Sequence, residues 1–194
     1  MKSIKLKNVP KQLSEQKVYY DPAFQRRVVW QKEDLNKYFE SLSRGWANAP
    51  ISLACVEGCL SYSLEIEDQH SVDYFNDLSS KGYKYVSIDG QNRTKRIIQF
   101  MSNDETISGK NFCDQDGKQI SEIVNKHFKD LEKDKDSDHL MLSVNLKATS
   151  ISAHIYERIT REQCAEIFRN INRTKQPNPQ NIRQSRSTPI AEYV

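Results

Sequence analysis

The sequence predicts an α+β fold in which a small mixed sheet is flanked by helices. Strand-like and helix-like segments alternate irregularly along the chain, without an internal repeat. The 194 residues are enough for one domain, residues 1–194, with a substantial core. Its content of 37% hydrophobic and 28% charged residues is typical of a soluble globular protein. No apolar run approaches the roughly 20 residues that span a bilayer, so we expect no membrane partner and a cytoplasmic location.

Two short strands and an amphipathic helix open the chain. Residues 3–9 alternate apolar and basic side chains, which predicts a half-exposed strand, and residues 17–20 form a second short strand. A helix is predicted over residues 32–44, ended by Gly45. Its apolar face has helical spacing and consists of Leu35, Tyr38, Phe39 and Leu42.

The middle of the chain is predicted to alternate strands and helices. Residues 51–56 form a buried strand, and Gly58 turns the chain into a partner strand over residues 60–66. A helix over residues 70–81 precedes a strand over residues 83–88, which are rich in β-forming side chains. From Asn92 the spacing becomes helical, with an apolar face of Ile97, Ile98 and Met101.

The last third contains weaker signals and one clear helix. Residues 120–131 have weak helical character, and residues 129–138 are linker-like and predict a mobile loop. Residues 140–146 and 151–156 predict two further strands. The capping-box sequence from Thr160 to Gln163 then starts a helix with a buried stripe. That stripe consists of Cys164, Ile167, Phe168 and Ile171, and Pro179 starts a last short helix.

The charges and cysteines exclude few functions. The net charge of +3 is too small to name a nucleic-acid partner. Residues 158–186 hold more arginines than acids, which is compatible with a nucleic-acid surface or with ordinary solvated surface. The cysteines form no CxxC pair and have no histidine at zinc-ligand spacing, so we interpret them as reduced structural thiols. They are Cys55, Cys59, Cys113 and Cys164.

The candidate functional centre is the strand-turn-helix segment over residues 88–94. The first N–H groups of a helix lack partners inside it and lie at its positive end, so they stabilise an anion. Gly90 lets a phosphate approach the backbone, and Arg93 adds a planar fork of donors. Asp89 can hold a metal ion or orient a nucleophile. The neutral side chains beside them are Gln91, Asn92 and Thr94. The alternative is a tight turn in which Asp89 caps the helix and Arg93 is solvated.

Two further clusters accompany this turn. Gln25, Arg26 and Arg27 lie between the aromatic residues Phe24 and Trp30, which we expect to anchor the loop in the core. The two arginines can reach a phosphate across the fold, or form a surface ion pair. The third cluster, residues 168–174, ends the clear helix, and its Asn170, Asn172 and Thr174 are also typical helix-capping residues.

In this order and spacing the clusters resemble the N-terminal domain of GmrSD-type restriction endonucleases, in the ParB/sulfiredoxin-like superfamily. The family pattern has a QRxxxW element, an apolar strand, an IDGQQR element and a late FxxIN element. Here Gln25, Arg26 and Trp30 match the first, and residues 88–93 match the third. Phe168, Ile171 and Asn172 match the last, so the resemblance covers nearly the whole chain.

The resemblance implies binding and probable hydrolysis of ATP or GTP, with Mg²⁺, coupled to DNA cleavage in defence against phage. It makes Asp89 and Arg93 the catalytic residues. The implied nucleotide-binding residues are Gln25, Arg26, Gly90, Gln91, Asn92 and Thr94. Arg27 and Arg173 are expected to contact DNA. A nuclease domain or subunit and a second copy of the chain, in a homodimer, are the expected protein partners.

Three departures from the family pattern matter. Asn92 replaces the second glutamine, and Asn181 stands where an acid is usual. The C-terminal HNH-type nuclease domain is absent, so we expect a fragment or a stand-alone domain, and neither His127 nor His139 has an HNH-like context. Two other functions stay open: a DNA-binding module without NTPase activity, and a ParB-like kinase or phosphotransferase.

Overall fold

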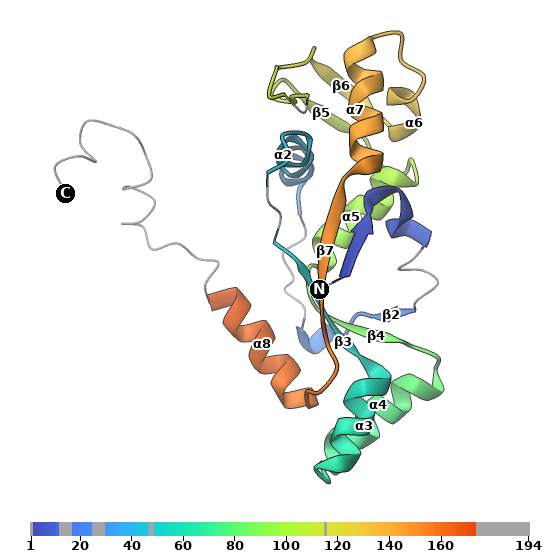
Figure 1. The fold of residues 1–194 in the computed structure, drawn as a ribbon, viewed down its shortest axis with the longest axis vertical. Helices are drawn as coiled ribbons and strands as arrows, with labels where there is room; N and C mark the ends of the chain where they lie inside the picture. The colour runs from blue at the N-terminus through green and yellow to red at the C-terminus, as the bar shows by residue number, and fades with distance from the viewer. Residues whose placement is uncertain (1, 12–16, 25–29, 47–48, 115, 174–194) are drawn as a thin grey trace, which may run out of the picture.

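A five-stranded mixed sheet forms the centre of the molecule in the computed structural model (Figure 1). The structure describes residues 2–11, 17–24, 30–46, 49–114 and 116–173. The spatial order of the strands is β1-β7-β3-β4-β2. Their bounds are β1 Lys2–Lys5, β7 Ser150–Tyr156, β3 Ile51–Cys55, β4 Tyr85–Asp89 and β2 Val18–Tyr19.

The sheet is mixed because chain direction changes between neighbours. β7 is antiparallel to β1 and parallel to β3, β3 is antiparallel to β4, and β4 is parallel to β2. A separate antiparallel pair, β5 Ile107–Gly109 and β6 Ile123–Lys126, lies near the top of Figure 1. These arrangements confirm the predicted α+β class with a small mixed sheet flanked by helices.

Helices cover both faces of the sheet and divide the core in two. The first core packs α2 Lys32–Ser43, α5 Gln91–Met101 and α7 Ser137–Ala148 against the sheet. The second packs α3 Val56–Glu65, α4 Gln69–Ser80 and α8 Arg161–Arg173 against it. Strand alternation explains the division, because Ile51 and Leu53 belong to the first core and Ala54 belongs to the second. Shorter helices include η1 Leu6–Asn8, η2 Pro22–Phe24 and α6 Phe128–Leu131.

Local sequence signals explain several helix boundaries. At the start of α8, the Gln163 side chain accepts from the Thr160 N–H at 2.8 Å, and the Thr160 hydroxyl accepts from the Gln163 N–H at 3.2 Å. This reciprocal pair confirms the predicted capping box. In α2 the predicted apolar face is buried through Leu35, Phe39 and Leu42. The strands predicted near residues 51–56, 83–88 and 151–156 are also present, as β3, β4 and β7.

Two predicted strands are wrong. Residues 60–65 belong to α3, whose Val56 and Cys59 are buried one turn apart. Residues 140–146 belong to α7, where Leu142 and Leu146 are buried at helical spacing. In both cases a short apolar run satisfied the strand pattern and the helical pattern equally.

Two weaker predictions also need correction. Within residues 120–131, predicted as weakly helical, the structure has the strand β6 followed by the single-turn helix α6. Residues 129–138 are not a loop throughout, because they include the end of α6 and the start of α7. The strand predicted over residues 3–9 ends at Lys5 and continues as η1.

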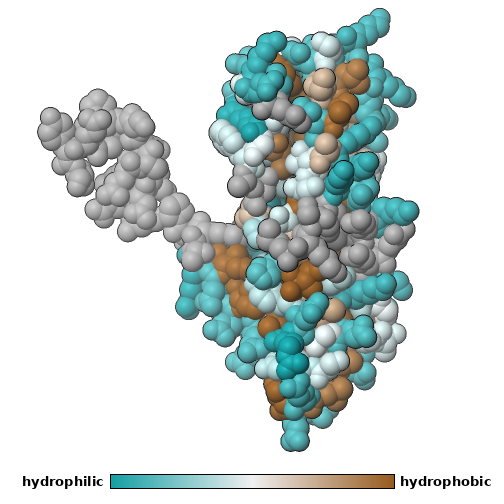
Figure 2. All heavy atoms as spheres, viewed as in Figure 1, coloured by the Kyte–Doolittle hydropathy of each residue, from teal (hydrophilic) through white to brown (hydrophobic). Residues whose placement is uncertain are grey.

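α7 is apolar on its outer side as well as on its buried side. Leu140, Met141 and Val144 are exposed, and apolar surface is visible over α7 in Figure 2. This surplus of apolar residues explains why α7 lacks a clear amphipathic pattern in the sequence. Among the described residues, no helix has the length and apolar character needed to cross a bilayer.

Phe100 provides a test of the first core. Its ring is fully buried, with ring centroids 4.6 Å from Phe39 and 5.6 Å from Phe128. We expect Phe100→Ala to lower the free energy of unfolding by about 3–5 kcal/mol, because a buried ring is replaced by a cavity. Urea denaturation followed by circular dichroism measures this loss. Leu64→Ala on the exposed side of α3 is the control, with an expected change within about 0.5 kcal/mol. Equal losses in the two variants would contradict the described core.

Candidate functional site

The turn between β4 and α5 depends on glycine at position 90. Its φ of +97° lies in the left-handed region, and a Cβ there would meet Ile51 Cγ2 at 2.6 Å. The first hydrogen bond of the helix runs from the Thr94 N–H to the Gly90 carbonyl at 2.9 Å. Gly90 is therefore required both for the backbone conformation and for the close approach to β3.

Arg93 ties this turn to the segment that precedes β3. Its guanidinium donates to the carbonyl of Pro50 at 3.1 Å, to the carbonyl of Ala49, and to the Asp89 carboxylate at 3.1 Å. Only 12% of the Arg93 side chain and 14% of the Asp89 side chain are exposed. The sequence left open whether Arg93 is solvated or turned toward a ligand. In this structure its planar fork holds the turn against two backbone carbonyls.

The start of α5 has the chemistry of an anion site. Gly90 has no side chain that could cap α5, and the N–H groups of the first helical turn lie directly after it. They lie at the positive end of the helix dipole. Gln91 and Asn92 are half-buried beside them, whereas Thr94 is buried. The backbone, rather than the Arg93 side chain, therefore presents donors at this turn.

The segment around the first cluster is joined to α5 through Trp30. The Trp30 carbonyl accepts a hydrogen bond from Arg96 of α5, and its ring packs edge-on against Tyr38 at 5.3 Å. Burial raises the pKa of Tyr38 to about 12, against an opposing effect of the nearby Arg93 charge. Gln25, Arg26 and Arg27 lie outside the described residues, so their predicted contacts stay predictions.

A buried carboxylate fixes the other end of that segment. Asp21 is 5% exposed, accepts from the Tyr74 hydroxyl at 2.7 Å and accepts from the Ala23 N–H at 2.8 Å. Burial raises the pKa of the Tyr74 hydroxyl, and the hydrogen bond to Asp21 raises it further. Phe24 then enters the second core and meets Phe168 of α8 at 6.4 Å. Phe24 and Trp30 thus anchor the segment, as the sequence predicted.

The third cluster lies against the same region. α8 packs against both β4 and η2, so the structure brings the late element close to the strand that leads into the turn. Asn172 is buried, and its side-chain amide donates to the Phe168 carbonyl one turn earlier at 2.9 Å. This bond gives Asn172 a structural role at the end of α8, the alternative to a functional role that the sequence left open. Thr174 lies beyond the residues that the structure describes.

The basic segment over residues 158–186 divides into engaged and exposed arginines. Arg158 makes a two-pronged ion pair with Glu65 at 2.8 and 2.9 Å. Arg161 lies 4.9 Å from the centre of the Tyr74 ring. Arg169 and Arg173 are exposed on α8, whereas residues 174–186 are outside the described part of the chain. The predicted DNA-contacting Arg173 is therefore accessible.

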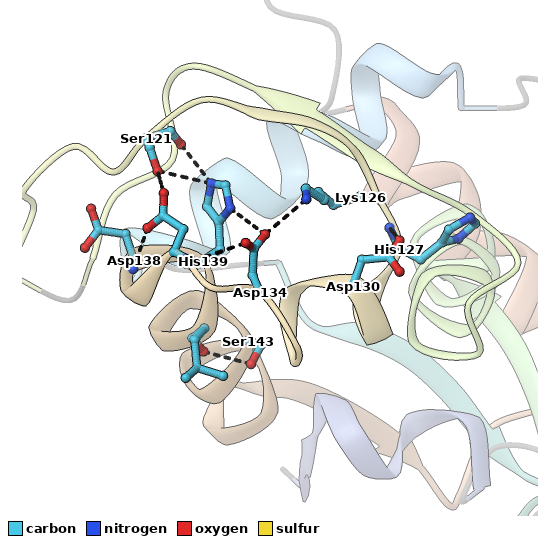
Figure 3. Close-up of polar contacts among 10 residues, drawn as sticks. Ser121, Lys126, His127, Asp130, Asp134, Asp138, His139 and Ser143 are labelled. Atoms are coloured by element: carbon cyan, nitrogen blue, oxygen red, sulfur yellow. Dashed lines mark hydrogen bonds and ion pairs between the residues drawn. The ribbon is translucent and has the colours of Figure 1, made fainter.

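A second polar cluster was missed by the sequence reasoning (Figure 3). His139 Nδ1 lies 2.9 Å from Asp134 Oδ2, and its Nε2 lies 3.2 Å from Ser121 Oγ. The Ser121 hydroxyl donates to Asp136. Lys126 pairs with the same Asp134 at 3.1 Å. The only sequence signal was the acidic run before α7, and its partners lie far along the chain.

This arrangement joins three elements rather than preparing a nucleophile. The hydrogen of the Ser121 hydroxyl points to the Asp136 carboxylate. The negative charge of that carboxylate opposes deprotonation of the hydroxyl. The hydrogen bond from His139 and the contacts of Lys126 hold the pKa of Asp134 well below its usual range. Across the described ranges, no three or more His, Cys, Asp or Glu side chains gather as a metal-ligand set. All four cysteines are free, and burial raises the pKa of Cys59 to about 11 and of Cys164 to about 12.

The fold and the turn define an α+β domain with a candidate site at a strand-turn-helix segment. The family model described as GmrSD restriction endonuclease, N-terminal domain, matches residues 8–187. The chain belongs to that family, which confirms the resemblance noted from the sequence. Neither the curated proteins nor the solved structures yielded a significant match. The ParB/sulfiredoxin-like assignment of the fold therefore stays a prediction.

Gly90→Ala tests the close approach at the turn. We expect a loss of about 1–3 kcal/mol in the free energy of unfolding, because the new methyl group meets Ile51 and φ is positive. Gly117→Ala is the matched control: its φ is also positive, at +80°, but nothing lies within 4 Å of the added Cβ. The difference between the two variants in urea denaturation measures the contact with β3. A larger loss in Gly117→Ala would contradict this geometry.

The His139 cluster predicts a pH-dependent stability. Since the folded-state pKa of Asp134 is lowered, its carboxylate stabilises the fold above the unfolded pKa of about 4. That contribution is lost as the pH falls through the folded-state pKa. We expect Asp134→Asn to lower the melting temperature at pH 5, and the difference from the wild type to narrow as the pH falls below about 4. A difference that stays constant over this range would contradict the assignment.

Proposed function

We propose that the turn over residues 89–94 binds the phosphates of a nucleoside triphosphate and that this domain hydrolyses it. The observation that carries the proposal is the left-handed Gly90 followed directly by the N-terminus of α5. A backbone of this shape offers donors to phosphate oxygens without an intervening side chain. Membership of the restriction endonuclease family supports a role of this hydrolysis in DNA cleavage.

In this proposal the main role of Arg93 is to hold the turn in position. Its bonds to the carbonyls of Ala49 and Pro50 keep α5 in one place relative to β3. Its third bond, to Asp89, keeps that carboxylate beside the turn. Removing Arg93 would therefore displace both the backbone donors and the acid.

Asp89 is the candidate catalytic acid of the turn. Mg²⁺ is commonly bound by one or two carboxylates together with phosphate oxygens, and Asp89 supplies one such carboxylate. A Mg²⁺ ion there would neutralise phosphate charge. Asp89 itself would hold the ion or orient the attacking water. The nucleotide is ATP or GTP, as the resemblance implies.

DNA is the second proposed partner. Arg169 and Arg173 are exposed and four residues apart on α8, so they project from the same side of the helix. The family's printed description as an N-terminal domain of a restriction endonuclease supports coupling to a nuclease domain or subunit. The same two arginines favour a second candidate function, a DNA-binding module without NTPase activity. In that case DNA affinity would fall with salt and would not depend on nucleotide.

Asp89→Asn and Asp89→Ala test the proposed hydrolysis. Asparagine keeps an oxygen acceptor for Arg93 but removes the charge, so its effect separates catalysis from the support of the turn. We expect both variants to lower kcat for NTP hydrolysis by at least about 100-fold, with unchanged circular dichroism. Released inorganic phosphate is the measurement.

Asp77→Ala is the matched control for this experiment. Asp77 pairs with Lys81 at the same spacing of four residues, but on the exposed surface of α4. Its hydrolysis rate should equal that of the wild type. Wild-type turnover in Asp89→Asn would overturn the catalytic assignment. DNA binding without any wild-type turnover would favour the DNA-binding module.

A further inference from the structure

Helix α5 holds one cation in solvent beside the phosphate turn. Of the three cations in this helix, Arg93 and Arg96 are each engaged by backbone carbonyls and by a carboxylate. Lys95 lies between them in the sequence and is exposed. Within the described part of the chain, no carboxylate forms an ion pair with it. Lys95 is therefore the cation of α5 whose charge is open to an anion from solvent.

Helical spacing places Lys95 over the first turn of α5. It lies four residues after Gln91 and thus on the same side of the helix. Thr94, Ile97 and Phe100 are buried on the opposite side. Side chains of a helix lean toward its N-terminus, so the ammonium of Lys95 extends back toward the turn at which the helix begins.

The ring of Tyr20 holds this ammonium at the same edge of the sheet as the turn. Lys95 Nζ lies 5.5 Å from the centre of the ring. Tyr20 directly follows β2, which is parallel to β4, so the carboxyl ends of both strands, with Tyr20 and Asp89, lie at one edge. Val18 packs against the first core and Tyr19 against the second, so strand alternation puts Tyr20 on the face that α5 covers.

A tyrosine ring positions the ammonium without neutralising it. Burial raises the pKa of the Tyr20 hydroxyl, so the ring is uncharged near neutral pH. The face of an aromatic ring attracts a cation through its quadrupole, which restricts the long lysine side chain. A carboxylate in the same place would repel a phosphate, whereas an uncharged ring leaves the full positive charge of Lys95 available to it.

We propose that Lys95, positioned by the ring of Tyr20, binds the polyphosphate chain at the turn. This inference rests on the proposed function, because it takes the phosphates to lie at Gly90. It separates the roles of two neighbouring cations: Arg93 holds the turn against β3, and Lys95 supplies charge to the ligand. Lys95 is a binding residue and Tyr20 a positioning residue, and neither takes part in the bond cleavage.

The experiment measures binding of inorganic tripolyphosphate with Mg²⁺ by calorimetry, because this ligand has no base or sugar. Lys95→Met keeps a long unbranched side chain but removes the charge. We expect its Kd to rise by at least about fivefold, since an exposed charged contact lies near the lower end of such energies. Lys95→Arg should bind nearly as tightly as the wild type, because it keeps the charge.

Lys81→Met is the matched control for this loss of charge. Lys81 is exposed at the end of α4, which packs against the second core on the other face of the sheet. Its tripolyphosphate affinity should equal that of the wild type. Equal losses in Lys81→Met and Lys95→Met would show an effect of net charge and would overturn the assignment of Lys95.

A double-mutant cycle tests the positioning role of Tyr20. We expect Tyr20→Leu to weaken tripolyphosphate binding when Lys95 is present and to have no further effect when Lys95→Met is combined with it. Tyr20→Phe keeps the ring and should keep the affinity. Equal losses from Tyr20→Leu in both backgrounds would mean that the ring acts on the fold rather than on Lys95, and would overturn its positioning role.

The remaining outcomes separate this inference from the proposed function. A wild type that binds no tripolyphosphate overturns the phosphate assignment of the turn itself. A wild type that binds it, with Lys95→Met unaffected, overturns the role of Lys95 and leaves the turn standing. If Lys95→Met weakens binding of a DNA oligonucleotide but not of tripolyphosphate, Lys95 serves DNA and the inference is wrong.

Discussion

The contact between the start of α5 and the entry to β3 is the constraint on which the candidate site depends. Arg93 donates to the carbonyls of Ala49 and Pro50 and to Asp89, while Gly90 brings the backbone within reach of Ile51. These bonds are shielded, because little of either charged side chain is exposed. In water such a pair contributes little, but a partly buried, multiply bonded arginine fixes geometry. The turn therefore has one shape before any ligand arrives.

The two cores hold different elements around this turn in place. The first core sets α5 against the sheet through Ile97 and Phe100. The second fixes α8 and the short helix η2, through Phe24 and the buried Asp21–Tyr74 bond. The His139 cluster secures the start of α7 (Figure 3). Its hydrogen bonds are made within the cluster, so it supports the fold.

Signals that are local in sequence were predictable, and contacts between distant residues were not. The capping box from Thr160 to Gln163 and the strand-glycine-helix pattern around Gly90 depend on neighbours along the chain, and both are present. The strand expected over residues 140–146 failed because α7 is apolar on two sides, and a short apolar run has no decisive period. The role of Arg93 was not predictable, since its carbonyl acceptors lie more than forty residues earlier.

The central claim is that backbone N–H groups at the start of α5 bind nucleotide phosphate. The most direct measurement is the amide NMR spectrum of the ¹⁵N-labelled protein, titrated with a non-hydrolysable ATP analogue and Mg²⁺. We predict saturable shifts at the amides of Gln91, Asn92 and Arg93, and the same shifts with inorganic tripolyphosphate. Saturable shifts elsewhere, with these three amides unchanged, would contradict the claim.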